Sequence, residues 1–277
     1  MRGLEVLGTV KPDMLRQIES MIRNKDYGIE EVKFDDSLLK HAELLDDTLM
    51  RVRSFRVDIT CEEDLRLLTG SFERTKAHGD NLIRLRVVQV DNYNYKRRFR
   101  PTATVERILR SRPNLQILNL CTVSLPTFVV LCPVLASSIL TITTLKLDVE
   151  LETEVEDKMS HKTLADRVEM LLQHPTIRDL DLTVKFSYSC SIRKTSHLEG
   201  DSVYHFERCV AEGLRTTSVR RFHLTVEGMG VHEASVVALT KMYENAWENW
   251  SLMDISLELI WFHFLTKPVL VSGVDAG

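Results

Sequence analysis

The chain has 277 residues, of which 44% are hydrophobic and 27% charged, and its 36 basic residues nearly balance 40 acidic ones. This composition is close to the globular average, so it excludes wholesale disorder, a collagen-like fibre and a disulfide-stapled miniprotein. A net charge of -4 argues against a surface built throughout for nucleic acid or anionic lipid.

The cysteines and the apolar windows indicate an intracellular protein, cytoplasmic or nuclear. Five scattered cysteines without a CxxC pair predict reduced, packed thiols rather than a disulfide framework. The first residues carry Glu5 in too short an apolar stretch for a signal peptide. The windows 127–140 and 257–265 are shorter than the about 20 residues of a bilayer span. Without a secretory signal, we interpret the glycosylation pattern at Asn249 as chance.

One hexamer pattern recurs along the chain and predicts its strands. Each copy reads apolar-x-x-apolar-x-apolar, and its last four residues alternate as a half-buried strand does. The first copy begins at residue 29 and the eighth at residue 252, an average step of about 32 residues, which indicates a repeat architecture. In chain order the predicted strands are 29–34, 52–57, 82–87, 115–120, 142–147, 177–182, 219–224 and 252–257.

Helical patterns lie between the predicted strands. Apolar residues three or four apart indicate amphipathic helices, and Pro113 and Pro175 stand where two of them must end. A strand, a helix and a return to another strand form a parallel βα unit. In chain order the predicted helices lie within 62–76, 104–110, 162–172, 202–214 and 231–247.

The strand faces favour an open sheet over a closed barrel or a doubly wound sheet. Strands that are buried on both faces are nearly continuous apolar runs. Here one face is apolar and the other is polar at all of its 24 positions except Val88, Ile117 and Cys121. We therefore predict an α/β fold, an open horseshoe-shaped solenoid with about eight parallel strands on its concave face and helices on its convex face.

Two segments, 111–121 and 174–182, carry the core L-x-x-L-x-L, and in them the chain resembles leucine-rich repeat proteins of the ribonuclease-inhibitor-like type, with irregular repeat lengths. The resemblance covers roughly residues 29–260. It departs from the family three residues after the last core position, where Val123 and Lys185 replace the expected Asn or Cys. The family's ladder of Asn side chains is therefore not expected.

The pattern divides the chain into three regions. Residues 1–28, with a helical pattern at 12–22, are predicted to form an N-terminal helical cap. Residues 29–260 form the solenoid, and residues 261–277 form a C-terminal cap and tail. The aromatic segment 261–265 is expected to cover the last repeat, as terminal units of a solenoid must.

No residue pattern predicts catalysis, a cofactor or a metal site. The sequence lacks a phosphate-binding loop and a nucleophile elbow, and Gly228-Met-Gly230 lacks the third glycine of a dinucleotide site. His232-Glu233 is not followed by the second histidine of a zinc-binding helix. We therefore expect a protein that is not an enzyme and holds no cofactor.

A basic and aromatic segment, 92–101, follows the third predicted strand. Its cations, interleaved with aromatic residues, could contact phosphates and stack on bases, or form a nuclear import signal or a patch for an acidic partner. A solvated loop is the simplest interpretation, so nucleic acid is kept as an alternative partner only. The cations are Lys96, Arg97, Arg98 and Arg100.

The concave face is the main candidate surface. Arg56, Arg84 and Arg86 fall on adjacent predicted strands, about 4.8 Å apart, so they can converge on one carboxylate-rich patch. Arginine beside apolar area is the mixture typical of an interface centre, although charge balancing that keeps the sheet soluble would also explain the face. The predicted partner-binding residues are Arg56, Arg84, Arg86, Val88, Ile117, Asn119, Cys121 and Lys146.

The resemblance implies a non-catalytic scaffold or adaptor that binds another protein, and the arginines of the concave face indicate a partner with an acidic segment. We expect a monomer without a membrane segment. The resemblance also implies relatives that serve as substrate-recognition arms of ubiquitin ligases, but no F-box is evident. Two alternatives remain, a nucleic-acid-associated protein that uses 92–101 and a GTPase-regulator-type horseshoe. The long acidic tail and arginine site that would support the second are missing.

Overall fold

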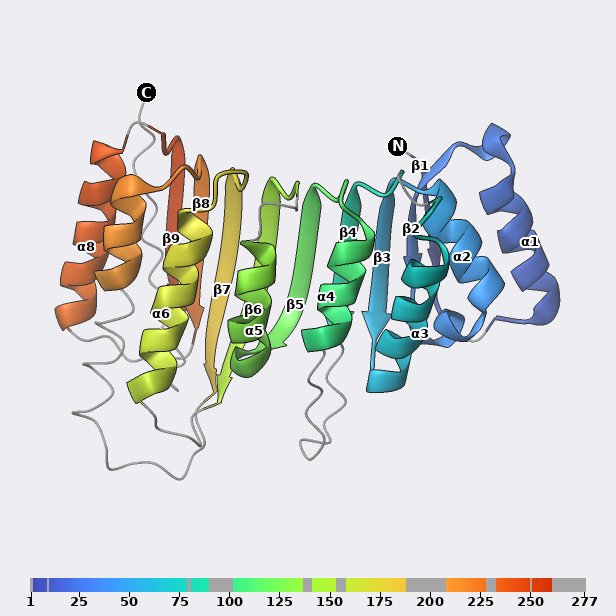
Figure 1. Ribbon diagram of the computed structural model, residues 1–277, viewed down its shortest axis with the longest axis horizontal. Coiled ribbons are helices and arrows are strands. Elements are labelled where there is room, and N and C mark those ends of the chain that lie inside the picture. The colour runs from blue at the N-terminus through green and yellow to red at the C-terminus, as the bar shows by residue number, and fades with distance from the viewer. Residues whose placement is uncertain are drawn as a thin grey trace. The chain divides into compact units, whose positions relative to one another are not determined.

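Nine strands follow one another across a single open parallel sheet in the order of the sequence, from β1 to β9 (Figure 1). The computed structural model describes residues 2–8, 10–78, 81–89, 102–136, 141–152, 158–187, 208–227, 233–249 and 251–260. The strands are β1 (Arg2–Val6), β2 (Ile29–Phe34), β3 (Ser54–Ile59), β4 (Arg84–Gln89), β5 (Ile117–Ser124), β6 (Thr144–Glu152), β7 (Asp179–Ser187), β8 (Arg221–Glu227) and β9 (Asp254–Ile260).

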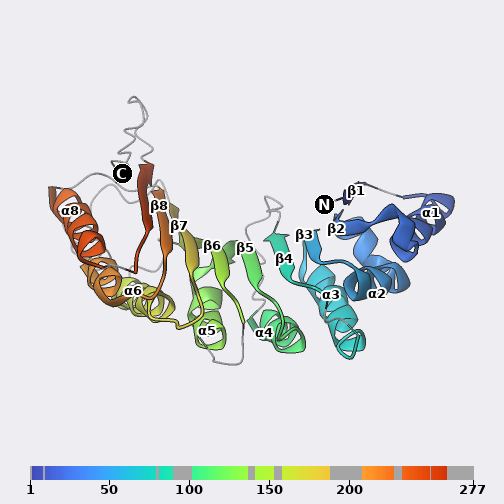
Figure 2. The ribbon, with the colours of Figure 1, turned by 90° about the horizontal axis from the view of Figure 1, so that it is seen from above.

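Helices alternate with these strands along the chain and lie against one face of the sheet in each compact unit (Figures 1 and 2). Residues 208–216 are also helical. Two short 3-10 turns, η1 (Lys25–Tyr27) and η2 (Asp36–Lys40), precede β2 and α2. The α-helices are α1 (Pro12–Arg23), α2 (Ala42–Arg51), α3 (Glu62–Arg74), α4 (Thr102–Ser111), α5 (Leu125–Leu135), α6 (Lys158–Leu172) and α8 (Glu233–Glu248).

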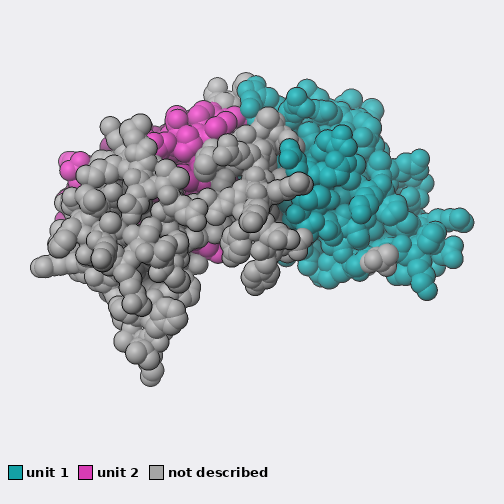
Figure 3. All heavy atoms as spheres, turned by 90° about the horizontal axis from the view of Figure 1, so that it is seen from below, with its two compact units in different colours: residues 1–122, 137–142 teal, residues 123–136, 143–277 magenta. Residues whose placement is uncertain are grey.

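The chain forms two compact units (Figure 3). Unit 1 contains residues 1–122 and 137–142, and unit 2 contains residues 123–136 and 143–277. Each unit has the same local construction, a parallel sheet with helices on one face.

Alternation along the strands builds the core of both units. In unit 1 one buried rung runs through Val32, Phe55, Leu85 and Leu118 on four neighbouring strands. Phe34 meets Phe55 edge to face, with ring centroids 5.7 Å apart. In unit 2 the corresponding rungs contain Leu145, Leu180, Phe222 and Leu147, Leu182, Leu224. The predicted facing of these strands is confirmed.

The prediction of about eight strands is one too few, because β1 precedes the first predicted strand. The segment 1–28 therefore contains a strand as well as the expected helix, and Leu4 and Val6 of β1 lie opposite Val32 and Phe34 of β2. The physical reason is that β1 carries the same hexamer pattern, with apolar residues at positions 1, 4 and 6. The predicted C-terminal cap, 261–277, lies outside the described residues.

The five helices predicted between strands coincide with α3, α4, α6, residues 208–216 and α8, although the first part of 202–214 lies outside the described residues. Two others, α2 and α5, were not predicted. Helix α5 is apolar almost all round, so it has no polar face to reveal a helical period. Pro126 stands in its first turn, where proline removes no helical hydrogen bond, whereas Pro133 lies inside the helix and removes one.

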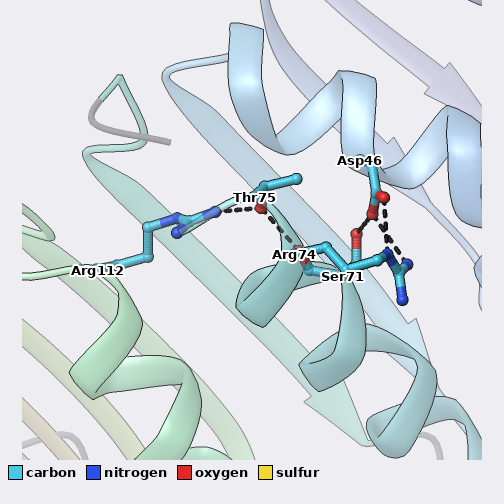
Figure 4. A network of polar contacts seen from close by, with 5 residues as sticks. All are labelled: Asp46, Ser71, Arg74, Thr75 and Arg112. Carbon is cyan, nitrogen blue, oxygen red and sulfur yellow. Dashed lines mark hydrogen bonds and ion pairs between the residues drawn. The ribbon is translucent and has the colours of Figure 1, made fainter. Parts of the chain in front are cut away.

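A polar network joins the helix layer of unit 1 (Figure 4). Asp46 of α2 accepts hydrogen bonds from Ser71 and Arg74 of α3, the latter at 2.8 and 3.0 Å. Thr75, which ends α3, donates to the carbonyl of Ser71 at 2.7 Å and accepts from Arg112. These bonds tie α2 and α3 to the end of α4, and so to the connections between β3, β4 and β5.

Arg112 is buried at the end of this network, with 2% of its surface exposed. Its guanidinium lies 4.9 Å from the ring centroid of Phe72 and donates to the carbonyl oxygens of Phe72 and Ser111. A cation is favourable there because the carbonyl end of helix α3 carries partial negative charge. Arg112 therefore serves as a cross-link between two helices.

The facing of β7 predicts unequal effects of two neighbouring substitutions. Leu180→Ala should lower the free energy of unfolding by about 2–5 kcal/mol, because Leu180 is 1% exposed between Leu145 and Phe222. Asp181→Ala removes only a half-exposed ion pair with Lys146 and should cost less than about 1 kcal/mol. Urea unfolding measures both values, and similar losses would contradict the assigned facing.

The cross-link formed by Arg112 predicts that two nearby arginines of the helix layer contribute unequally to stability. Arg112→Met keeps the apolar stem but leaves buried carbonyl oxygens without their donor, so it should cost about 1–3 kcal/mol. Arg110→Met is the matched control, since Arg110 is exposed and pairs with Glu106 one turn earlier. Thermal and urea unfolding of both variants test this, and equal stability of the two would show that Arg112 links nothing.

Candidate functional site

The open face, which we define as the sheet face opposite the helices, carries the predicted site residues in rows. Strand register sets these rows in unit 1. The first row is Glu31, Ser54, Arg84 and Ile117, from β2 to β5. The second is Glu5, Lys33, Arg56, Arg86 and Asn119, from β1 to β5. The third is Asp58, Val88 and Cys121, from β3 to β5.

Three arginines, Arg56, Arg84 and Arg86, meet in these rows, and we call them the arginine cluster. Arg56 and Arg86 are directly paired in the register of β3 and β4, and Arg84 lies two residues before Arg86. Like charges placed opposite each other on neighbouring strands destabilise a sheet. The arrangement therefore concentrates positive charge at a cost to the fold.

The cluster is only partly neutralised. Arg56 Nε lies 3.6 Å from Asp58 Oδ1, an ion pair that is too long for a hydrogen bond. Among the described residues, Arg84 and Arg86 have no carboxylate partner, and the buried Nε of Arg86 has no hydrogen-bond acceptor. Arg84 is exposed, and Arg86 is half-buried with its Nε atom enclosed.

Other cations of the open face are neutralised by neighbouring strands. In unit 1, Lys33 pairs with Glu5 of β1, and this hydrogen bond lowers the pKa of the Glu5 carboxyl. In unit 2, Lys146 lies 2.6 Å from Asp181. Also in unit 2, Arg221 donates to Asp179 at 2.8 Å, and this hydrogen bond lowers the pKa of the Asp179 carboxyl. Direct cross-strand pairing is thus the usual arrangement, from which Arg84 and Arg86 depart.

An apolar strip, Val88, Ile117 and Cys121, adjoins the cluster. Val88 lies opposite Cys121, and Ile117 lies opposite Arg84, with all three side chains half-buried. Between Ile117 and Cys121 on β5, the amide oxygen of Asn119 accepts a hydrogen bond from the Cys121 thiol at 3.2 Å. Charged and apolar groups therefore share one small area of β3, β4 and β5.

The structure brings together seven of the eight predicted partner-binding residues. The eighth, Lys146, belongs to unit 2, where it is engaged by Asp181. The predicted basic segment 92–101, with Lys96, Arg97, Arg98 and Arg100, lies outside the described residues.

Sequence reasoning missed one residue that shapes this surface, Glu5. It lies on β1, the strand that was not predicted, and it neutralises Lys33 at the end of the second row. The signal that could have found it is the hexamer spacing of Met1, Leu4 and Val6. Without β1, Lys33 would have been counted as part of the cationic surface.

Metal-binding groups and thiols are the other candidates for chemistry within the described ranges. No set of three or more His, Cys, Asp and Glu side chains there is arranged to hold a metal ion. No disulfide joins the four described cysteines, and burial raises the pKa of the Cys132 thiol, which keeps it protonated. No described helix has the length and apolar character that crossing a bilayer requires.

The side chain of Asn249 is occupied by the fold. Its amide nitrogen donates to the carbonyls of Leu214 and Thr217 at 2.8 and 3.0 Å, and its oxygen accepts from the Ser251 amide. A glycan on this nitrogen would break these bonds, so the structure opposes glycosylation at this sequence pattern.

The unequal neutralisation of the open face predicts that replacing an unpaired cation costs less stability than replacing a paired one. At low ionic strength, Arg86→Gln should lower the free energy of unfolding by no more than about 0.5 kcal/mol or raise it, since it relieves repulsion from Arg56. Lys146→Gln, the control, should lower it by up to about 1 kcal/mol, because Asp181 loses its partner. Denaturant unfolding distinguishes them, and a larger loss in Arg86→Gln would mean that this arginine stabilises the fold.

Comparison of the sequence with protein-family models and with curated proteins finds no match. What the structure itself shows is a repeated parallel strand–helix pattern, compatible with a repeat solenoid and consistent with a repeat protein.

Proposed function

We propose that this chain is a non-catalytic adaptor or scaffold, similar to leucine-rich repeat horseshoes, that binds an acidic segment of another protein on the open face of unit 1. One observation carries the proposal: among the described residues, Arg84 and Arg86 lack carboxylate partners on a face where Lys33, Lys146 and Arg221 have them. An acidic partner would supply the missing charge.

The surroundings of the cluster favour a protein over nucleic acid. The open-face positions of β2, β3, β4 and β5 carry no aromatic side chain on which a base could stack. Asp58 and Glu31 border the cluster and would repel a phosphate backbone that extended beyond it. The apolar strip adds the contact area that protein interface centres combine with arginine.

The position of the cluster on strands also supports recognition. Arginine presents a planar fork that binds carboxylates through two parallel hydrogen bonds. Here the forks project from regular strands whose connections are tied by the Asp46 to Arg112 network. A rigid surface loses little conformational entropy on binding, so more of the interaction free energy appears as affinity.

The leucine-rich repeat assignment rests on the segments that carry the L-x-x-L-x-L core and on the rungs that they form. Leu115, Leu118 and Leu120 are all buried, as are Ile177, Leu180 and Leu182. Solenoids of this kind present extended faces to their partners. The proposed binding mode therefore agrees with what the resemblance implies.

Charge reversal tests the proposed function. Proteins captured by the wild-type chain are compared with those captured by the double variant Arg84→Glu, Arg86→Glu, and the partner lost from the variant is purified. Its affinity for the variant should be at least tenfold weaker than for wild type, about 1.4 kcal/mol. Calorimetry or surface plasmon resonance gives this ratio.

The double variant Arg66→Glu, Arg110→Glu is the matched control, with the same change of charge on exposed faces of α3 and α4. It should bind as wild type does. A purified partner that binds the open-face variant as tightly as wild type would refute the proposed surface. Salt-sensitive RNA or DNA binding that requires Lys96, Arg97, Arg98 and Arg100 would favour the nucleic-acid alternative instead.

A further inference from the structure

Along the single strand β4, the open face changes from basic to apolar. Arg84, Arg86 and Val88 alternate with buried residues and so point to the same face, two residues apart. Two residues of a strand span about 6.6 Å, so the face offers cation, cation and apolar contact at equal intervals. No charge of the opposite sign interrupts this series on β4.

On the basis of the proposed function, we infer that the partner segment binds in extended conformation along β4 and presents acid, acid and apolar side chains at every second residue. Its two carboxylates pair with Arg84 and Arg86, and its apolar side chain covers Val88 and Cys121. The recognised motif is thus acid-x-acid-x-apolar, or the same order read in reverse when the segment runs the other way.

The spacing of the three residues on β4 favours an extended partner segment over a helical one. Side chains on one face of an extended chain repeat every two residues, which is the interval at which Arg84, Arg86 and Val88 repeat. On a helix the rows of residues four apart are inclined to the axis, so a helical partner drifts away from a straight series of three positions. An extended segment stays in register over the whole series.

The neighbouring strands fix where the apolar residue must lie. Asp58 is paired in register with Val88, and its ion pair with Arg56 is long, at 3.6 Å, so an acid at this level would meet a like charge that is only partly balanced. At the level of Arg86, Arg56 adds a second cation. An acid is therefore favoured in the middle of the motif, and an apolar residue at the end that faces Asp58.

Peptides of equal composition test the motif. Fluorescently labelled peptides with identical Gly/Ser flanks carry Glu-Ser-Glu-Ser-Leu, or the control Glu-Ser-Leu-Ser-Glu, and are titrated with the full chain at low ionic strength. The control cannot match the series in either chain direction, although its charge is the same. Anisotropy should show at least fivefold tighter binding of the first peptide.

Variants connect this preference to the named residues. In Val88→Ser the two peptides should bind with equal affinity, because the apolar contact is lost while both arginines remain. In Arg84→Glu, Arg86→Glu neither peptide should bind. A third peptide with the same two Glu and one Leu at positions one, five and eight of a helix-forming sequence should bind no more tightly than the control.

The outcomes distinguish the proposed peptide motif from the proposed function, which is the binding of an acidic protein segment. Equal binding of both peptides to wild type, abolished by Arg84→Glu, Arg86→Glu, would overturn the motif and leave an acidic partner in place. Tighter binding of the helical peptide would overturn the extended conformation. Absence of binding by every peptide would overturn the motif. The proposed function would then be decided by the affinity of the purified protein partner for wild type and for Arg84→Glu, Arg86→Glu.

Discussion

Burial of only one face of each strand is the constraint on which the rest of this structure depends. Each βα unit returns its helix to the same side of the sheet within its unit, so alternate residues enter the core and the others remain against solvent. The register that places Val57 between Phe34 and Val87 also aligns Arg56 with Arg86. Core packing thereby dictates which charged groups become neighbours.

A face of aligned charges has to be neutralised row by row. Opposite charges on neighbouring strands accomplish this for Lys33 with Glu5, and for Arg221 with Asp179. Each pair contributes little stability by itself, because its members are at least partly exposed. The rule fails at Arg84 and Arg86, where no carboxylate of the described residues offsets the positive charge. Such local conflicts are expected at binding sites.

Much of the fold could be predicted because the hexamer pattern is strong. The apolar pair of each hexamer, such as Leu118 and Leu120, marks the strand, its facing and its register with its neighbours. Strand β1 was missed although it follows the same pattern, and α5 was missed because a helix without a polar face has no visible period. The pattern reveals an element only where its apolar and polar faces differ, so it does not reveal a helix such as α5.

The composition of the candidate site was predictable, but its electrostatics were not. Alternation alone places Arg84, Arg86 and Val88 on one face. Ion pairing depends on side-chain conformation and on which strand lies alongside. Arg56 pairs along its own strand with Asp58, whereas Lys146 pairs directly across to Asp181 on the neighbouring strand.

The two sides of the sheet use arginine in opposite ways. On the helix side, Arg112 contacts carbonyl oxygens and an aromatic ring, and its hydrogen bonds join α3 to the end of α4. On the open side, the stem of Arg86 is packed so closely that its Nε is buried, yet its fork meets no carboxylate of the described chain. A packed stem restricts the conformations that binding would otherwise have to select, which lowers the entropic cost of association. The first arrangement ties part of the helix layer of unit 1 together. The second leaves positive charge on the open face that no carboxylate of the described chain neutralises.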